Sequence, residues 1–437
     1  MELLEPEIPQ RDKDIGAQEP QVKPYAWYAL AILTAFHSVN AIDRQVMFVV
    51  LEPMKAEFRI GDATAGALTG MAHGIAFALT ALPLAWMADR MNRARLLSVM
   101  AIIWGCATAF VSIASTIPQL FIARMSVGAS ESGTTPACFS LIADYFPPRR
   151  RGTAVGLYFV SAAIGTGGAY IIGARVTVAF GWRATFLVAA VPTLIVALIA
   201  LLTLRDPGRG RFEQSNREKA EALGMHQVVP IIVRSPAIMC GIVGHTAAIM
   251  TISAYYAFSI SMLVRDHGQT LKEAALLVGI ATGLSHALGS ILGGPLCDRF
   301  TQGRGDRIGL FPALILILAI PVGMVMTLST ALPITTLGLF AFTFLAGMWL
   351  PHGYATPFTL APPEARASTM GVTLIFTNLI GTGLGPALAG FMSDRFGSIS
   401  DALASMLIFY LTGALFLSIA SWLSRTAAAI SAEPVVD

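Results

Sequence analysis

The sequence has too few charged side chains for a water-soluble protein of its size. Asp, Glu, Lys and Arg make up 13% of its 437 residues, whereas 55% of the residues are hydrophobic. Soluble domains typically carry about 25% charged residues. A membrane protein can manage with fewer, because lipid is an apolar solvent for the outer face of a helix bundle. The composition therefore predicts an integral membrane protein.

Cysteine is also scarce. The four cysteines lie apart in apolar stretches, without the spacing of a metal site or a redox pair, so we expect small core residues, no disulfide and no metal. The net charge of +3 gives no reason to expect a nucleic-acid partner. No GK[ST] follows the glycine-rich stretches 165–168 and 381–385, and no catalytic triad is visible, so we expect neither a cofactor nor enzyme activity.

The apolar residues fall into twelve runs, each near the roughly 20 residues that a membrane span needs. They predict an all-α membrane protein with twelve transmembrane helices in two bundles of six. The runs are 26–51, 63–88, 96–117, 119–143, 152–174, 184–204, 236–263, 274–297, 308–329, 331–361, 367–393 and 402–424.

A charged segment that begins with Pro and Gly separates the two sets of six, and its middle, around 213–223, is a possible surface helix. No cleavable leader is expected, since the first residues have no apolar core. The predicted parts are an N-terminal tail (1–24), a first bundle (25–204), a linker (205–235), a second bundle (236–424) and a C-terminal tail (425–437).

Lysine and arginine are distributed unevenly along this pattern. With the N-terminus inside, 20 of the 29 lie in inside segments, 7 in outside loops and 2 within spans. Basic residues accumulate on the cytoplasmic side of membrane proteins. We therefore expect both termini and the linker to be cytoplasmic.

The two halves share sequence elements. Thr-Pro, an apolar stretch, Pro-Pro and a basic turn occur in 134–156 and recur in 355–371. AWMADRMNRAR (85–95) and GPLCDRFTQGR (294–304) each place Asp-Arg where a span ends on the inside. These segments resemble the small-x-x-x-Asp-Arg-x-Gly-Arg motif of the major facilitator superfamily, with Asn92 where Gly is usual. The resemblance implies two pseudo-symmetric six-helix halves around a central substrate site.

The Asp-Arg motifs predict charged latches with a role in gating. An Asp near the end of a helix would pair with an Arg across the seam between the halves. The alternative is simple anchoring of basic residues on the inside. The motif residues are Asp89, Arg90, Arg93, Asp298 and Arg299.

A narrower resemblance covers about residues 36–210. NAIDRQV (40–46), RMSVGASESG (124–133), LIADYFPPRRRG (141–152), GTGGAYIIGARV (165–176) and RDPGRG (205–210) follow one another as in the spinster family. The resemblance suggests export of lysolipid- or sphingoid-type amphiphiles. The short loops and tails resemble a bacterial relative, which implies the plasma (bacterial inner) membrane and contact with membrane lipid. We expect a monomer, since such bundles usually enclose their cavity within one chain.

Four charged residues lie inside the predicted spans, all in the first half: Asp43, Arg44, Arg124 and Glu131. A charge at the centre of a spanning helix costs on the order of 2.5–3.5 kcal/mol, so these residues should pair or face a wet cavity. Neighbours on a helix point about 100° apart, and residues seven apart are separated by about 10 Å of rise. Pairing between the two spans is therefore favoured. Asp43 with Arg124 and Arg44 with Glu131 both remain open.

We interpret this group as a proton-linked switch, because the proton affinity of a buried carboxyl changes when a nearby Arg moves. Glu131 is the first candidate for the coupling proton and Asp43 the second. Arg124 and Arg44 would hold an anionic head group or set the proton affinity of the acids. The alternative is a static salt-bridge network that fixes helix register.

Other polar residues in the spans are weaker candidates. His37, Asn40, Tyr354 and Asn378 are possible cavity-lining residues, and each could equally be a helix–helix contact. Several span histidines could titrate. A lone histidine on a helix is more often a polar core residue, and these share no metal spacing. They are His37, His73, His245, His286 and His352.

These features favour a secondary active transporter that works by alternating access and is coupled to protons. The charge asymmetry favours an amphiphilic substrate, with its head group at the charges of the first half and its tail against the uncharged second half. One alternative is a proton-coupled transporter of small organic anions or drugs. Another is a membrane sensor or scaffold without transport. A channel is disfavoured because no filter-like sequence is present.

Overall fold

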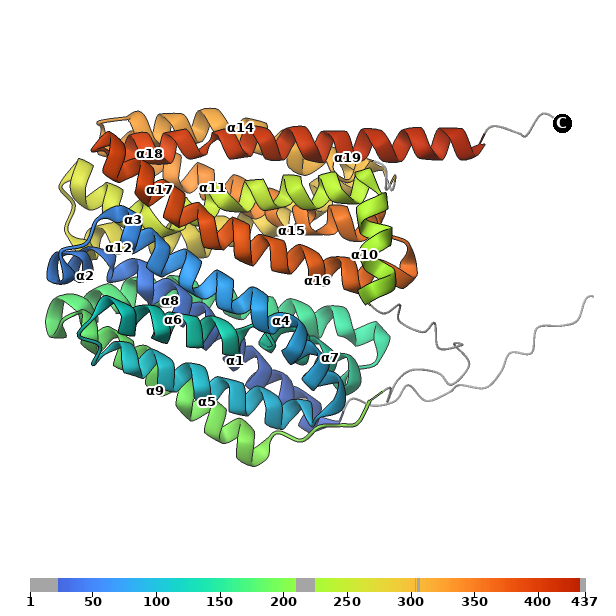
Figure 1. Cartoon of the computed structure of the whole chain (residues 1–437), viewed down its shortest axis with the longest axis horizontal. Helices are drawn as coiled ribbons and strands as arrows, with labels where there is room; N and C mark the ends of the chain where they lie inside the picture. The colour runs from blue at the N-terminus through green and yellow to red at the C-terminus, as the bar shows by residue number, and fades with distance from the viewer. Residues whose placement is uncertain (1–22, 210–224, 303, 305–306, 433–437) are drawn as a thin grey trace, which may run out of the picture.

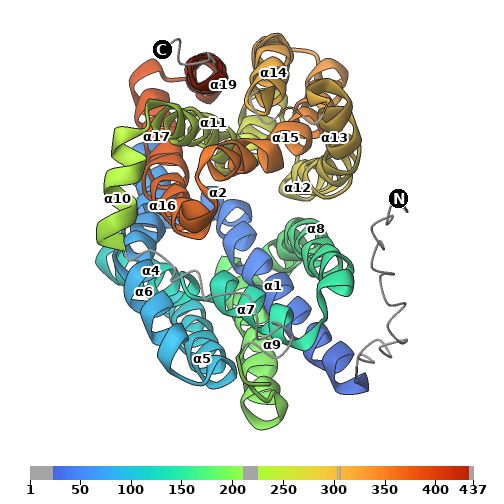
Figure 2. The ribbon, with the colours of Figure 1, turned by 90° about the vertical axis from the view of Figure 1, so that its right-hand side faces the viewer.

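The computed structural model describes residues 23–209, 225–302, 304 and 307–432, which form helices joined by short turns, without strands. Helices are expected here because lipid offers backbone groups no hydrogen-bond partners, so each segment must satisfy its own. Twelve helical segments run along the long axis of Figure 1, in two groups of six. Viewed along this axis, the first group lies below and the second above (Figure 2).

The first half contains six segments of the length of the bundle, and a short helix, α2 (Leu51–Phe58), follows the first of them. The six segments are α1 (Pro24–Val49); α3 (Asp62–Gly66), η1 (Ala67–Met71) and α4 (Ala72–Arg90) in one run; α5 (Arg93–Val111); α6 (Ile117–Glu131) with α7 (Thr134–Tyr145); α8 (Pro148–Phe180); and α9 (Trp182–Thr203).

The second half has the same plan. A short helix, η4 (Pro363–Ala365), precedes its fifth segment. The six segments are α11 (Pro236–His267); α12 (Leu271–Ile280), η2 (Ala281–Ser285) and α13 (His286–Thr301) in one run; α14 (Leu310–Leu328); α15 (Leu332–Leu360); α16 (Arg366–Phe376), η5 (Thr377–Thr382) and α17 (Gly383–Phe396) in one run; and α18 (Ile399–Met406) with α19 (Ile408–Ala432).

The predicted twelve-helix, all-α fold is confirmed. By length and composition alone, nine segments of the described chain can cross a membrane; α1, α6 with α7, and α8 are not among them. The first two of these exceptions contain all four charges predicted to lie inside spans. The surface helix predicted around 213–223 falls outside the described residues, as do most of the N-terminal tail and the end of the C-terminal tail.

The two ends of the bundle differ, and we call them the linker end and the opposite end. At the linker end lie the start of α5, the end of α9 and the short helix α10 (Met225–Arg234), which runs across the other helices (Figure 1). Its buried Val228 and Ile232 pack against the start of α11. The opposite end carries α2 and the start of α3. There α8, α11 and α17 each end at a glycine with positive φ, a conformation that L residues rarely adopt.

The two halves touch most closely where α3, η1 and α4 cross η5 and α17. Glycines allow this approach: a Cβ added to Gly66 would lie 2.2 Å from the carbonyl oxygen of Pro386, and one on Gly390 would lie 2.0 Å from that of Asp62. Both distances are far below van der Waals contact. These backbone contacts form the seam between the halves.

Candidate functional site

One buried ion pair joins α1 to α6 inside the first half. Arg124 Nη1 lies 3.3 Å from Asp43 Oδ2, and the two side chains are 3% and 1% exposed. The hydroxyl of Thr108, on α5, donates to the other oxygen of Asp43. Of the two pairings that the sequence left open, this is the one that forms, and it brings three helices together.

A second buried pair joins α6 to α4. His73 Nε2 lies 2.9 Å from Glu131 Oε2, and both side chains are almost fully buried. The other oxygen of Glu131 has no hydrogen-bond partner among the described residues. The side chain of Asn40 lies beside this carboxylate, and Arg44 and Arg124 lie close enough to act on it electrostatically. The site therefore contains two carboxylates with different partners, one a permanent cation and the other an imidazole.

Sequence reasoning grouped His73 with four other lone histidines and missed its partner. One argument could have indicated the partner of Glu131: if Arg124 pairs with Asp43, the buried carboxylate of Glu131 needs another hydrogen-bond donor. His73 and His37 are the histidines of the first-half spans. Instead of meeting Glu131, the His37 ring stacks on Tyr158 with 4.2 Å between the ring centroids.

Arg44 points across the seam instead of pairing with Glu131. Its Nη2 donates to Asn378 Oδ1, on η5 of the second half, at 3.3 Å. Arg44 is half-buried and makes no ion pair among the described residues. Tyr354 lies nearby, since its hydroxyl is 3.5 Å from Oγ1 of Thr377, the neighbour of Asn378. Within the described part of the chain, Arg44 is thus a half-exposed cation bound to a neutral amide.

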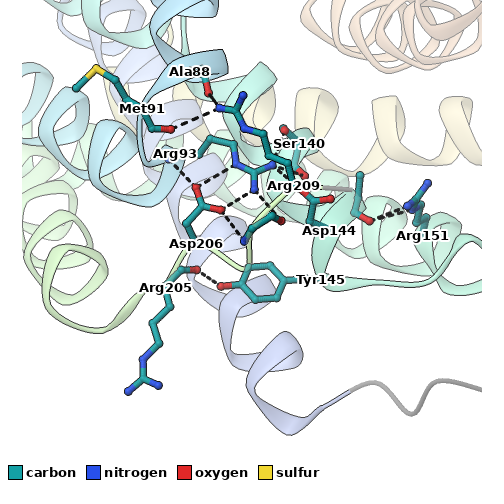
Figure 3. Close-up of polar contacts among 12 residues, drawn as sticks. Ala88, Met91, Arg93, Ser140, Asp144, Tyr145, Arg151, Arg205, Asp206 and Arg209 are labelled. Carbon is teal, nitrogen blue, oxygen red and sulfur yellow. Dashed lines mark hydrogen bonds and ion pairs between the residues drawn. The ribbon is translucent and has the colours of Figure 1, made fainter. Parts of the chain in front are cut away.

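Arg93 belongs to a cluster at the linker end that we call the clasp, drawn in Figure 3. Its guanidinium binds Asp206 through Nη2 at 2.5 Å and also pairs with Asp144 of α7. The hydroxyl of Tyr145 donates to the Arg205 carbonyl in the same cluster. All of these residues lie in the first half or at the start of the linker that continues from it. In this structure Arg93 does not pair across the seam as predicted, because the carboxylate of Asp206, three residues after the end of α9, lies beside its guanidinium.

The electrostatics of the clasp favour an ionised Asp206. Burial raises the pKa of Asp206, but hydrogen bonds from the side chain and backbone of Arg93, together with its charge, outweigh this and hold the pKa below its usual value. Arg209, two residues past the Pro that follows Asp206, donates to the Ala88 carbonyl at 2.5 Å and so ties the end of α4 to the clasp.

The other latch residues do not form a pair that the structure describes. Arg90 lies over the ring of Trp86, 4.1 Å from its centroid. Asp298 and Arg299 are exposed. The side chain of Asp89 lies outside the described part of the chain.

A cluster at the opposite end, here called the outer latch, joins the halves and was not predicted. Arg265, at the end of α11, donates from Nη1 to Asp62 Oδ2 at 2.7 Å and also pairs with Glu52. Lys55 and Ser393 bind the same Asp62 carboxylate.

Asp394 of the second half completes the outer latch. Its carboxylate accepts the backbone N–H groups of Asp62 and Ala63, both at 2.8 Å. A carboxylate at the start of a helix is favoured by the unpaired N–H groups and the helix dipole there. Lys55 and Arg265 are two of the seven basic residues in the predicted outside loops, and nothing in their sequence positions links them to Asp62.

Comparison with known proteins places this geometry in a family. Residues 33–386 match the family model described as Major Facilitator Superfamily. The chain belongs to the major facilitator superfamily. An MFS-type efflux pump of Mycolicibacterium smegmatis is 24% identical over 397 residues, which cover 87% of this chain and 86% of the pump. Protein spinster of Drosophila melanogaster is 22% identical over 402 residues, 89% of this chain but only 64% of that protein, so the chain spans less than two thirds of it.

A solved structure agrees with this assignment. A bacterial homologue of the human lysosomal transporter spinster, in an inward-facing and unoccupied conformation, superposes with a TM-score of 0.85. It is 26% identical, and the match covers 93% of this chain and 99% of that one. This member of the superfamily is therefore spinster-like, as its sequence motifs predicted. It is a multi-pass membrane transporter and not an enzyme.

Proposed function

We propose that this transporter is a proton-coupled secondary transporter that moves a lipid-like amphiphile by alternating access. The observation that carries the proposal is the confinement of buried charge to one half. Asp43, Arg124 and Glu131 are each at most 4% exposed in the interior of the first half. Buried ionisable groups in membrane proteins typically mark ion or proton pathways, because keeping them there is costly.

The conformation supports alternating access with the linker end facing the cytoplasm. Among the described residues, the ion pairs that join the halves are those of Arg265 at the opposite end, whereas the clasp at the linker end lies within one half. The superposed spinster homologue is inward-facing. We infer an inward-facing state with both termini in the cytoplasm and the protein in the bacterial inner membrane.

The substrate proposal rests on Arg44 and on the contrast between the halves. Arg44 is a half-exposed cation at the seam, bound to the neutral amide of Asn378. A phosphate or carboxylate head group would give it the charged partner that it lacks. The spans predicted for the second half contain no Asp, Glu, Lys or Arg, so an acyl tail could lie against them. A lysophospholipid combines both features.

The test is uptake into proteoliposomes with and without a pH gradient. Wild type should accumulate labelled lysophosphatidylcholine faster when a pH gradient is applied. Glu131→Gln should lose about 100-fold or more of the gradient-driven part, because an amide cannot carry a proton. Gradient-driven uptake that is equal in wild type and Glu131→Gln would refute the role of Glu131.

The control for the substrate is glycerophosphocholine, which has the same head group without the acyl tail. Transport of the tailed molecule alone supports the amphiphile. Transport of both, or of a small organic anion or drug in preference, would favour the alternative class of substrate. If none of the tested molecules is transported, the result would favour the other alternative, a membrane sensor or scaffold without transport.

A further inference from the structure

The two halves repeat a short segment around a histidine. TGMAHGI (69–75) in the first half corresponds to TGLSHAL (282–288) in the second. In both segments the histidine follows a π-helical turn. His286 comes directly after η2, and His73 is separated from η1 by one residue. Such single π turns inside α-helices are frequent at functional sites.

The helix that packs on each histidine is repeated as well. A Cβ on Gly128 of α6 would lie 2.3 Å from the His73 carbonyl oxygen, and one on Gly347 of α15 would lie 2.1 Å from that of His286. The backbones around the two histidines are therefore equivalent. Any difference in what the histidines do must come from the side chains that they meet.

Those side chains differ in one decisive respect. His73 meets the carboxylate of Glu131, three residues after Gly128, at 2.9 Å. The equivalent position, three residues after Gly347, is Leu350. His286 meets a hydroxyl instead, with 3.1 Å from its Nδ1 to Tyr256 Oη. The repeated scaffold thus holds an acid–imidazole pair in the first half only.

We propose that His73 and Glu131 hold the coupling proton as one unit, with His73 as the positioning residue that lets Glu131 change its charge without losing its hydrogen bond. This inference rests on the proton coupling proposed above and assigns a role to a residue outside the acids and arginines of that proposal.

The proton balance of the unit is simple. With a neutral imidazole donating from Nε2, the carboxylate accepts and the pair carries one negative charge. One proton from water makes the pair neutral, either as a carboxylic acid that donates to Nε2 or as a carboxylate that accepts from an imidazolium. Each form keeps the hydrogen bond between the same two atoms, and an unmade buried hydrogen bond would cost about 1–3 kcal/mol.

The surrounding groups make the charge of this unit matter. Asp43 and Arg44 lie on α1 and Arg124 on α6, and all of them lie within electrostatic range of His73. With the His73–Glu131 unit negative, these groups are balanced. Proton uptake leaves one positive charge in excess. It resides on Arg44, which makes no ion pair among the described residues.

The unit also lies one residue from the seam. A Cβ on Gly74, the neighbour of His73, would lie 2.5 Å from the carbonyl oxygen of Asn378, so the two backbones are in contact. Arg44 binds the side chain of the same Asn378. A change of charge at His73 and Glu131 therefore acts on a residue of the second half through both a backbone contact and a cation.

The experiment compares His73→Gln with His286→Gln in proteoliposomes. Glutamine can donate and accept a hydrogen bond but does not titrate. We expect His73→Gln to retain substrate exchange across the membrane at equal pH, while gradient-driven uptake falls about tenfold or more and its pH dependence flattens. His286→Gln, on the equivalent backbone, should keep the wild-type pH dependence. A wild-type pH profile in His73→Gln would overturn the proposal.

A second measurement does not depend on transport. Infrared difference spectra of purified protein between acid and neutral pH should show a carboxyl C=O band that is absent in Glu131→Gln. In His73→Gln the midpoint of this band should move by about one pH unit or more. An unmoved midpoint would count against His73. If wild-type uptake does not depend on the pH gradient, the proposed proton coupling is wrong. If wild-type uptake depends on the gradient and His73→Gln behaves like wild type, only the role of His73 is wrong.

Discussion

At the residue scale, the charged residues inside the first half differ in whether their partners can titrate. Arg124 is a permanent cation, so its pair with Asp43 holds α1 against α6 in one register. His73 can exchange a proton with Glu131. Among the described residues, Arg44 bonds to the neutral amide of Asn378, and we propose that it binds the anionic head group of the substrate. Under the proposed function, these three adjacent groups would serve structure, proton transfer and substrate binding, respectively.

The register role of Asp43 predicts a non-additive mutant cycle. Asp43→Leu leaves Arg124 buried without its carboxylate, which should cost about 3–5 kcal/mol of unfolding free energy. Asp43→Leu combined with Arg124→Met removes both charges and should cost less than the single change. Thermal unfolding of the purified variants in one detergent measures this. Additive losses in the double variant would show that the pair contributes nothing to register.

Sequence reasoning reached part of this site. The cost of intramembrane charge selected Asp43, Arg44, Arg124 and Glu131, and helix geometry reduced their pairing to two options. The choice between these options depends on how α1 is rotated against its neighbours, which side-chain packing decides. The pairing of His73 with Glu131 was harder to predict, because η1 interrupts the regular α-helical spacing just before His73 and a uniform 100° per residue misplaces its side chain.

At the element scale, the seam depends on glycines that let backbones meet. Gly390 of α17 faces the Asp62 carbonyl, and Gly66 faces that of Pro386. Both contacts lie on the side of the outer latch. Since a side chain at either glycine would collide with backbone, which cannot turn aside as a side chain can, these contacts hold the opposite end closed.

Gly390→Ala should therefore shift the protein away from the inward-facing state. Spin labels on the exposed residues Ala56 and Lys272, in a cysteine-free background, would report the spacing of the halves at the opposite end. We expect a longer distance in Gly390→Ala. Gly371→Ala, in the same helical run, is the matched control, because a Cβ there meets nothing within 4 Å. Equal distance distributions in the two variants would contradict the role of this contact.

Much of the element order could be predicted from the sequence, because runs of about 20 apolar residues specify spanning helices by themselves. The breaks inside spans could not, since η1, η2 and η5 follow from packing at the seam and carry no composition signal. The latch motif misled for a similar reason. Its pattern fixes where Arg93 lies along the chain, but the partner is chosen by which carboxylate the fold brings nearest.

At the scale of the whole molecule, ion pairs join the two halves at one end, and at the other end the clasp braces the first half internally. The outer latch crosses the seam through Arg265, whereas the clasp joins only parts of the first half through Arg93. The two clusters should therefore respond differently to mutation. Loss of the first should change the balance between conformations, and loss of the second should change stability.

Arg265→Gln tests the first expectation. It removes the ion pairs to Asp62 and Glu52, and a loss of about 1 kcal/mol would change the ratio of the two states about fivefold. The same spin-label pair on Ala56 and Lys272 should show a larger long-distance population. An unchanged distribution would mean that glycine packing alone closes this end.

Asp206→Asn is the control, and it should lower the unfolding temperature without changing the spin-label distances. Because the pKa of Asp206 is lowered in the folded protein, its contribution is present above the pKa of the unfolded chain and is lost as pH falls through the folded value. The stability difference between wild type and Asp206→Asn should therefore shrink in strong acid.

The low hydropathy of α1 has a consequence for biosynthesis. This helix contains Asp43 and Arg44 and is not among the nine segments of the described chain that are long and apolar enough to cross a membrane. Arg124, which neutralises Asp43, is 81 residues further along the chain. At about 5–20 residues per second, a ribosome needs roughly 4–16 s to produce it. During that interval we expect α1 to remain beside the insertion machinery, and the cell's capacity to shelter it there would limit how much of this protein reaches the membrane.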